Sequence, residues 1–408
     1  MTLTIQRLGR RGDGVTDGPD GRVLVPLTLP GEVIDRAIAD GRIAAPRILT
    51  PSPQRVRPAC PHYSACGGCQ LQHASDDFVA RWKAGVIETA LAAQGITAQV
   101  ATVQTSPERS RRRAVISVRR TKKGALAGFH ARASDQVIDV SDCPVIRPRI
   151  QAALPALRAM AGIGASRQGE LSVVVTDSAA GLDLSVRGGK PADAALLQDM
   201  AALAAEQDWA RLVWGDTPLT RRPPAQVFGR AQVTPPPGAF LQATAEGEAA
   251  LLAAVRHAVG DAARIVDLFA GCGTFTLPLA EQAEVHAVEG LPEPLAALDA
   301  GWRQTKGLRR VTTESRDLAK RPLMADELNH YDAIVIDPPR AGAEAQAREI
   351  AASQVPRVGF VSCDPVTFAR DCRILTQGGY VLDQILAVDQ FRWSAHVEIV
   401  ASLRRNLA

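Results

Sequence analysis

The sequence has no uninterrupted run of about eighteen apolar residues, the length that a membrane-spanning helix needs. No apolar core follows a basic start after Met1, so no secretory signal is predicted. We therefore expect a cytoplasmic protein without a membrane partner. Structural disulfides are rare in the cytoplasm, so the 7 cysteines are better explained as ligands, nucleophiles or core residues than as bridges.

The chain also lacks a strong excess of one charge. It has 47 Lys and Arg against 43 Asp and Glu, and a net charge of +4 does not by itself indicate a nucleic-acid partner. The distribution says more, because a basic run without any acid surrounds the apolar residues 114–118, which are expected to form a strand. Such a strand would present a basic face suited to phosphates, and the alternative is a solvated surface without a partner. The basic residues of the run are Arg109, Arg111, Arg112, Arg113, Arg119, Arg120, Lys122 and Lys123.

Internal repeats are absent, and the length of 408 residues allows two or three domains. Residues 1–55 contain short strands separated by glycines, which is typical of a small barrel. Residues 56–233 mix strands and helices, with a helix expected at 77–94. Residues 234–408 alternate helices and strands, as in a doubly wound α/β sheet. Two further alanine-rich helices are predicted, near 150–160 and at 191–206.

A glycine turn is the first candidate for ligand binding. Gly271 and Gly273 follow an apolar strand and open a helix that is expected to begin near Thr274. Glu289 closes the next apolar run, where a carboxylate can accept hydrogen bonds from ribose hydroxyls. The third glycine of a dinucleotide fingerprint would fall at Thr276, so S-adenosylmethionine is the better ligand and an NAD-type domain is the alternative.

Two more apolar strands end in chemically active residues, Asp337 and Cys363. Ligands of open α/β sheets bind outside the carboxyl ends of the strands, so these residues should meet the glycine turn in one crevice. Asp337-Pro338-Pro339-Arg340 stands where amino-methyltransferases carry an Asn-Pro-Pro-Tyr type motif. This difference argues against nitrogen methylation and favours a carbon target.

Cys363 and Glu398 together fit covalent catalysis on a uracil ring. Uracil carbon 5 becomes nucleophilic only after a thiolate adds to carbon 6, and a base must then remove the carbon 5 proton. The site must lower the pKa of the thiol or accept its proton as it adds. A buried cysteine without chemistry is the ordinary alternative, and it fits Cys372.

Cys60, Cys66 and Cys69 form a C-x5-C-x2-C cluster, and Cys143 is the candidate fourth ligand. Four thiolates fit either zinc or an iron–sulfur cluster. Zinc sites usually pair two short C-x2-C knuckles, whereas this chain has a three-plus-one arrangement.

Taken together, these motifs resemble those of the bacterial RNA uracil-C5 methyltransferases, which form 5-methyluridine. The resemblance covers nearly the whole chain. Residues 8–14 and 29–32 resemble a shortened TRAM domain, an OB-type barrel, and residues 66–73 resemble the family's cluster motif. Residues 111–114 resemble its basic strand. The most specific similarity is the long motif at residues 362–371.

The resemblance implies an α/β fold with a C-terminal Rossmann-like S-adenosylmethionine domain, an N-terminal TRAM-like barrel and a central α+β domain that carries a [4Fe-4S] cluster. Carried over by position, Cys363 is the nucleophile and Glu398 the base. The expected cofactor contacts are Gln242, Phe269, Gly271, Gly273, Thr274, Glu289, Asp317 and Asp337, and the expected cluster ligands are Cys60, Cys66, Cys69 and Cys143.

Two departures from the family pattern concern the site. Asp364 stands where asparagine is usual after the nucleophile, and Ala243-Thr244 replaces the asparagine after Gln242. Either change could alter local geometry without changing the chemistry.

The family branch with a barrel and a cluster acts mostly on 23S ribosomal RNA, so we expect that RNA as the substrate. A tRNA uracil-C5 methyltransferase is the alternative, although that branch usually lacks both features. A non-catalytic iron–sulfur RNA-binding protein is disfavoured by the intact pair of Cys363 and Glu398. No obligate protein partner is implied.

Overall fold

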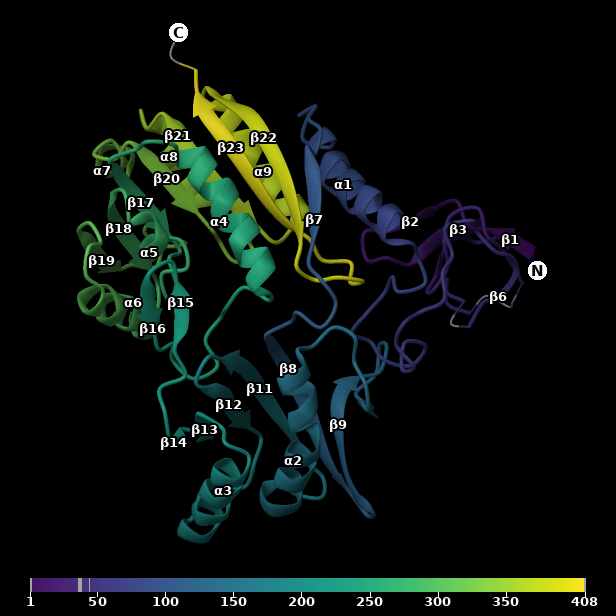
Figure 1. Ribbon diagram of the computed structural model, residues 1–408. Helices are drawn as coiled ribbons and strands as arrows, with labels where there is room; N and C mark the ends of the chain where they lie inside the picture. Colours follow the sequence, from purple (N-terminus) through teal and green to yellow (C-terminus); the bar gives the residue numbers. More distant parts are fainter. Residues whose placement is uncertain (1, 36–38, 44, 407–408) are drawn as a thin grey trace.

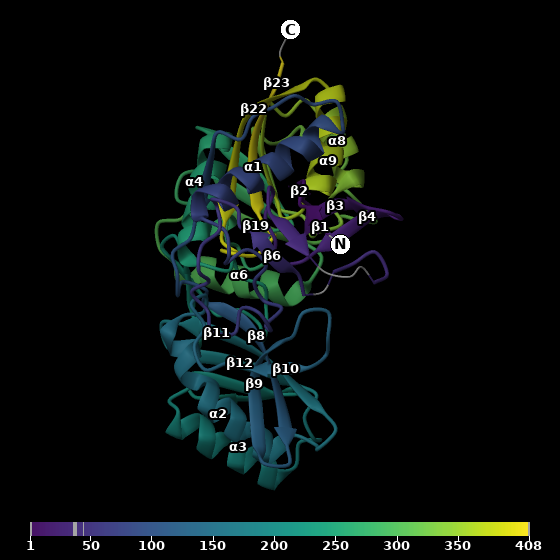
Figure 2. The same cartoon turned by 90° about the vertical axis from the view of Figure 1, so that its right-hand side faces the viewer.

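The computed structural model describes residues 2–35, 39–43 and 45–406. Its strands form two small sheets near the N-terminus, a seven-stranded sheet, a two-stranded hairpin and an eight-stranded sheet (Figure 1). Turned by 90°, the eight-stranded sheet lies above the seven-stranded one, and the N-terminal strands lie beside α1 (Figure 2). Within the described part of the chain, no helix is long and apolar enough to cross a membrane.

The N-terminal region is rich in strands, as the glycine-punctuated sequence predicts. One antiparallel sheet has the order β1-β5-β6 and the other β2-β3-β4. Leu3, Val25 and Ile34 form part of a small apolar core between the strands. Gly14 is required here, because a Cβ at this position would lie 2.1 Å from the Thr28 hydroxyl oxygen. The strands are β1 (Thr2–Thr4), β2 (Arg7–Leu8), β3 (Gly14–Gly18), β4 (Gly21–Val25), β5 (Val33–Asp35) and β6 (Arg47–Thr50).

The seven-stranded sheet has the order β10-β9-β8-β11-β12-β13-β14 and is covered by α2 (Pro148–Gly164) and α3 (Ala194–Glu206). Helix α3 begins after Asp193, whose carboxylate accepts a hydrogen bond from the Leu196 N–H at 2.8 Å and so caps the helix. The strands are β8 (Arg113–Thr121), β9 (Gly124–His130), β10 (Val137–Asp139), β11 (Glu170–Ser178), β12 (Gly181–Arg187), β13 (Arg211–Trp214) and β14 (Thr217–Thr220). The alanine-rich helices predicted from the sequence are thus confirmed.

A hairpin of β15 (Gln226–Phe228) and β16 (Ala231–Val233) leads into the eight-stranded sheet, whose order is β19-β18-β17-β20-β21-β23-β22-β7. All neighbours pair in parallel except β23, which is antiparallel to both β21 and β22. The strands are β17 (Arg264–Leu268), β18 (Glu284–Glu289), β19 (Val311–Ser315), β20 (Ala333–Ile336), β21 (Arg357–Ser362), β22 (Tyr380–Asp389), β23 (Glu398–Arg405) and β7 (Thr102–Thr105).

Helices cover both faces of this sheet, and each face has its own hydrophobic core. One core includes side chains of α1, α8 and α9, and the other includes side chains of α4 and α6. The strands are apolar on both faces because both are covered. The helices are α1 (Asp76–Ala92), α4 (Ala245–Val259), α5 (Thr276–Leu279), α6 (Pro292–Gln304), α7 (Ala325–Leu328), α8 (Glu344–Ala352) and α9 (Pro365–Gln377). The doubly wound sheet expected from the sequence is therefore present.

Helix α1 and strand β7 belong to the eight-stranded sheet, although they precede the seven-stranded sheet in the chain. Strand β7 pairs with β22, and Ile87 and Leu91 of α1 are buried in the same core as α9. The helix at 77–94 was predicted correctly, since α1 covers most of this range. The element against which its apolar face packs could not be predicted. Periodicity indicates that one face of a helix is buried, but it does not indicate which other element covers that face.

The helix expected to begin near Thr274 begins two residues later than predicted. The chain after Gly273 continues as a turn, and α5 begins at Thr276. The Thr276 hydroxyl donates to the buried Asp267 carboxylate at 2.5 Å, which anchors the start of this helix to β17.

Candidate active site and cysteine-lined cavity

The predicted catalytic residues meet at one edge of the eight-stranded sheet. Strands β17, β20, β21 and β23 are consecutive neighbours (Figure 1). Asp337 follows the carboxyl end of β20, and Cys363 follows that of β21. Glu398 is the first residue of β23, and because β23 is antiparallel, its start lies at the same edge. The reversed last strand thus brings a third reactive side chain to the crevice.

The glycine turn after β17 has an unusual backbone. Phe269, Gly271 and Gly273 have positive φ angles of 65°, 55° and 90°. A non-glycine residue at such an angle is uncommon and is often found at functional sites. A Cβ on Gly273 would lie 2.8 Å from the Leu298 side chain, whereas a Cβ on Gly271 would meet nothing within 4 Å. The turn is therefore tightly packed on one side and open on the other, where a ligand could approach.

Glu289 holds this turn in place. Its carboxylate accepts hydrogen bonds from the Gly271 N–H at 3.1 Å and from the Leu291 N–H at 3.0 Å. Each carboxylate oxygen can accept a second hydrogen bond, so Glu289 remains able to bind a hydroxyl group. Thr274 follows the turn and is half-buried.

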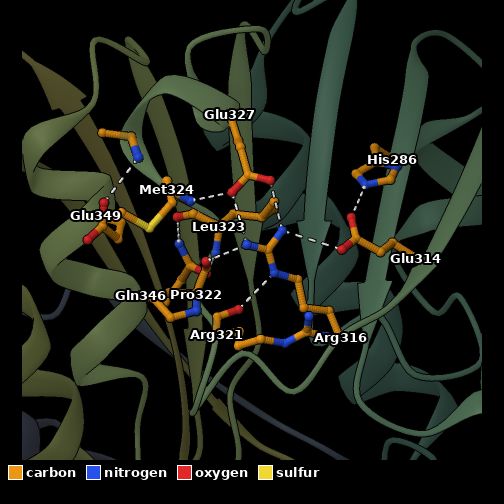
Figure 3. Close-up of polar contacts among 11 residues, drawn as sticks. His286, Glu314, Arg316, Arg321, Pro322, Leu323, Met324, Glu327, Gln346 and Glu349 are labelled. Carbon is orange, nitrogen blue, oxygen red and sulfur yellow. Dashed lines mark hydrogen bonds and ion pairs between the residues drawn. The ribbon is translucent and has the colours of Figure 1, made fainter.

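Asp317 lies two residues after β19 on an exposed turn. Its neighbour Arg316 donates to both Glu327 carboxylate oxygens, at 2.8 and 3.0 Å, and to the Pro322 carbonyl at 2.8 Å (Figure 3). These bonds fix the backbone beside Asp317. The Asp317 carboxylate itself pairs with Lys320 at 3.1 Å. Such an exposed ion pair is weak, so it leaves Asp317 available at the carboxyl end of β19.

Burial raises the pKa values of the acids in the crevice. Glu398 is 4% exposed, and burial raises its pKa to about 7, although a hydrogen bond from Gln390 and the charge of Arg340 oppose this shift. The pKa of Asp337 is raised well above its ordinary value by burial and then by the charges of Glu398 and Asp267. A carboxylate with a pKa of about 7, as Glu398 has, can exchange protons near neutral pH.

Burial also raises the pKa of Cys363, to about 11, and the charges of Glu398 and Asp337 add to this effect. The charge of Arg340 and its hydrogen bond to the sulfur act in the opposite direction. The protein alone therefore favours the thiol over the thiolate. The sequence left two possibilities: a lowered thiol pKa, or loss of the thiol proton as the sulfur adds to the ring. The raised pKa of Cys363 fits the second.

Asp364, the residue after the nucleophile, caps helix α9. Its carboxylate accepts hydrogen bonds from the Val366 and Thr367 N–H groups at 2.9 and 3.3 Å. An asparagine could make the same cap. The Arg10 guanidinium of the N-terminal region lies 3.4 Å from both carboxylate oxygens, so the acid gains a charged partner there.

Gln242 lies in the crevice but is joined to a residue that the sequence analysis missed. Its Nε2 donates to Asp337 Oδ2 at 3.4 Å, and its Oε1 accepts from Gln390 Nε2 at 2.6 Å. Gln390 Oε1 accepts from the Ala243 N–H at 2.7 Å. Arg340 was also missed as a partner of Cys363. No motif could have revealed Gln390, because its partners are distant in sequence.

Three arginines of the basic run make contacts within the protein, whereas phosphate binding by the run as a whole stays a prediction. Arg112 is buried; it donates to the Gln242 carbonyl at 3.0 Å and pairs with Glu248. Arg113 donates to the Ala239 carbonyl at 3.0 Å. The Arg111 guanidinium lies 5.3 Å from the centre of the Phe391 ring. These side chains hold the segment around Gln242, while Lys122 and Lys123 at the end of the run are exposed.

The four predicted cluster ligands line one cavity of about 340 Å³. Cys143 is buried and the other three cysteines are half-buried. The Gly68 N–H points at Cys66 Sγ, 3.4 Å away. Arg340 and His396 also line the cavity, so it borders the crevice of Cys363. The four lining thiols are Cys60, Cys66, Cys69 and Cys143.

The arrangement of these thiols does not converge on a single ion. Across residues 2–35, 39–43 and 45–406, no three His, Cys, Asp or Glu side chains are placed to hold one metal ion together. In a [4Fe-4S] cluster each cysteine binds a different iron, and four thiols that line one cavity are compatible with the chemistry of such a group.

Known proteins are similar to this chain in sequence. The family model for tRNA (uracil-5-)-methyltransferases matches residues 308–406. A Brucella suis protein described as an uncharacterized RNA methyltransferase is 45% identical over 99% of this chain and 98% of its own. The 23S rRNA (uracil(1939)-C(5))-methyltransferase RlmD of Chromohalobacter salexigens is 33% identical over 99% of this chain and 89% of its own.

A solved structure has the same fold over the whole length. The tRNA (uracil-54, C5)-methyltransferase of Pyrococcus abyssi in complex with S-adenosyl-L-homocysteine matches with a TM-score of 0.78 and 23% identity, and the match covers 99% of each chain. With the identity of the relatives above, these findings show that the chain belongs to the RNA uracil-C5 methyltransferases and is an S-adenosylmethionine-dependent enzyme.

Proposed function

We propose that the protein methylates carbon 5 of a uridine in 23S ribosomal RNA, at the position equivalent to uracil 1939 that the RlmD relative is named for. The RlmD match over nearly the whole chain supports ribosomal RNA as the substrate. The similarity to the Pyrococcus tRNA enzyme makes tRNA the second candidate substrate. At 23% identity, however, this similarity supports a common fold and not a common substrate. A cytoplasmic location, as predicted from the sequence, goes with this proposal.

The proposed chemistry uses Cys363 and Glu398. The Cys363 thiol gives its proton to solvent as its sulfur bonds to uracil carbon 6, and Arg340 lowers the cost of ionising the thiol. The electron pair of the carbon 5–carbon 6 double bond moves onto carbon 5 and oxygen 4 as an enolate. Carbon 5 then attacks the methyl group of S-adenosylmethionine, so a carbon–carbon bond forms as the methyl–sulfur bond breaks. Glu398 takes the carbon 5 proton, and the carbon 6–sulfur bond breaks to release 5-methyluridine. The single observation that carries this proposal is the shared crevice of Cys363 and Glu398.

The proposed cofactor contacts follow the edge of the sheet around this pair. Gly271 offers open space beside a tight turn, and Glu289 retains free acceptor capacity next to it. Both features support a bound nucleoside with its ribose at Glu289. Phe269, Thr274, Asp317, Asp337 and Gln242 complete the proposed set, as predicted from the sequence.

We further propose that the cysteine-lined cavity holds a [4Fe-4S] cluster on Cys60, Cys66, Cys69 and Cys143. The cavity that all four thiols line supports this proposal. When bound, the cluster would join the loop of the first three cysteines to the segment of Cys143. The N-terminal strands, 1–55, are proposed to be a TRAM-like OB barrel. The predicted central domain at 56–233 and methyltransferase domain at 234–408 need one correction, because α1 and β7 lie within 56–233 but pack in the methyltransferase sheet.

The substrate is tested by methylation with labelled S-adenosylmethionine on two transcripts, a 23S ribosomal RNA fragment containing the 1939 site and a tRNA. We expect label in the ribosomal fragment, lost when the target uridine is replaced by cytidine. Label only in the tRNA would move the proposal to its second candidate. Label in a uridine elsewhere in the ribosomal fragment would keep the reaction and overturn the site.

A further inference from the structure

Gln390 is a buried side chain between two groups of the proposed active site. It directly follows β22, which is parallel to β21, and so it stands at the edge of the sheet where Cys363 lies. The side chain is 2% exposed. Its Nε2 donates to Gln242 Oε1 at 2.6 Å, and its Oε1 accepts from the Ala243 N–H at 2.7 Å. The amide is held at both ends, so it cannot turn over without losing both bonds.

This arrangement fixes the amide of Gln242 as well. Because Gln242 Oε1 accepts from Gln390, Gln242 Nε2 must point the other way, toward Asp337 Oδ2 at 3.4 Å. Gln242 is itself 2% exposed. One N–H of its Nε2 serves Asp337, and the second is free to meet a ligand in the crevice.

The Gln390 amide also lowers the pKa of the Glu398 carboxyl, against the larger, opposite effect of burial. The other charged or titratable groups that face Glu398 are Asp337 and Arg340 from the segment after β20 and Cys363 after β21. Gln390 is thus a neutral donor among groups that can change charge.

Helix α4 is shaped to accept this side chain. A Cβ added to Gly247 would lie 2.7 Å from the Gln390 Cβ and 2.8 Å from the Thr244 hydroxyl oxygen. Real Cβ atoms do not approach other carbons that closely, and the Gln390 Cβ is not the free end of a flexible side chain. The glycine in the first turns of α4 therefore leaves the space in which Gln390 lies.

We propose that Gln390 is a positioning residue for methyl transfer, which holds Gln242 in one amide orientation and Glu398 in place as the base. The inference rests on the proposed function, since it needs Glu398 to remove the carbon 5 proton. Gln390 acts through its two partners and is not a catalytic residue itself.

Two variants test this inference independently. Gln390→Met removes both polar ends at similar volume. Gly247→Ala leaves every polar group in place but displaces Gln390, and alanine is favourable in a helix. Both should lower kcat by roughly ten- to hundred-fold, because a hydrogen bond to a charged group is lost or bent. The KM for RNA should change less. The matched control is Gln384→Met, an exposed glutamine of β22, the strand that Gln390 follows, and this variant should behave as the wild type.

The pH dependence of kcat separates positioning from a general structural role. Loss of the Gln390 donor raises the pKa of Glu398, so the acidic limb of the profile should move to higher pH in both variants. A wild-type kcat, or a lower kcat with an unmoved acidic limb, would overturn the inference. If Gln390→Met does not fold, Gly247→Ala gives the same readout. Glu398→Gln is measured in parallel: normal turnover there would count against the proposed function and not against the role of Gln390 alone.

Discussion

At the scale of single residues, burial sets the chemistry of the crevice. The pKa of Glu398 is raised to about 7, whereas an ordinary glutamic acid has 4.5. This is near the pH at which a general base works best in a neutral cell. The same burial makes ionisation of Glu398 unfavourable in the folded state, so the acid that serves catalysis is expected to reduce stability.

The stability cost of Glu398 has a definite pH window. Below pH 4.5 the acid is neutral in both the folded and the unfolded state, and it costs nothing. Between 4.5 and about 7 only the unfolded state ionises, so the free energy of unfolding falls as pH rises, by up to about 3 kcal/mol. Glu398→Gln removes this titration. We expect its melting temperature to exceed that of the wild type increasingly from pH 5 to pH 8. A difference that stays constant over this range would contradict the raised pKa.

The sequence predicts the reactive residues of this site better than the residues that hold them in position. Cys363 and Asp337 stand at the ends of apolar runs, so their meeting in one crevice follows from a parallel sheet. Gln390 and Arg112 have no such signal. Their partners at Gln242 are 148 and 130 residues away, and nothing in a local pattern encodes a contact over that distance.

At the scale of elements, a buried ion pair joins α1 to the end of β22, the strand that Gln390 follows. Lys83 of α1 lies 2.5 Å from the Asp389 carboxylate at the end of β22, and both side chains are at most 1% exposed. Lys83 Nζ also lies 3.4 Å from the Phe391 carbonyl. The pair therefore fixes α1 beside the loop that leads to Glu398.

Breaking this pair should destabilise the protein strongly. Lys83→Met leaves a buried carboxylate without its partner and should cost about 3–5 kcal/mol in the free energy of unfolding. Lys83→Met combined with Asp389→Asn should recover most of that loss, since no unpaired charge remains. Lys306→Met at an exposed lysine is the control for the substitution itself. Chemical denaturation measures all three, and a double variant no more stable than Lys83→Met would refute the ion-pair account.

The two ends of the basic run, on either side of β8, should have different roles: the lysines after the strand bind RNA, and Arg112 before it stabilises the fold. Lys122→Gln with Lys123→Gln should weaken RNA binding and reduce its salt dependence by up to about one unit of slope per lysine, with an unchanged melting temperature. Arg112→Met should instead lower the melting temperature, because it leaves the Glu248 carboxylate without its guanidinium partner. Binding titrations at several salt concentrations check the first result. If the salt dependence of RNA binding is unchanged in the lysine variant, these lysines form a solvated surface without an RNA contact.

The sequence predicts where several helices and strands lie, but not which sheet each one joins. The apolar spacing of α1 and the strand pattern of β8 are strong, and both elements lie where expected. That β7 pairs with β22, across most of the chain, depends on a sheet edge that only the folded protein provides. The same holds for the short α5, whose start is set by the contact between Thr276 and Asp267.

At the scale of the whole molecule, the cysteine-lined cavity lies between segments that are far apart in the sequence and borders the proposed active site. We expect protein purified without oxygen to contain about four iron and four sulfide per chain. Cys143→Ser should lose most of this iron and lower the melting temperature, whereas Cys372→Ser, at a buried cysteine outside the cavity, should keep it. About one zinc per chain without sulfide would overturn the cluster proposal.

The most direct test of the account is whether the protein forms a covalent complex with its RNA. Glu398→Gln should still add Cys363 to uracil and transfer the methyl group, but it cannot remove the carbon 5 proton. A denaturant-resistant protein–RNA complex that carries the labelled methyl group should therefore accumulate. Cys363→Ala should form neither complex nor 5-methyluridine. If Cys363→Ala still makes 5-methyluridine, or if Glu398→Gln turns over without any trapped complex, the covalent mechanism is contradicted.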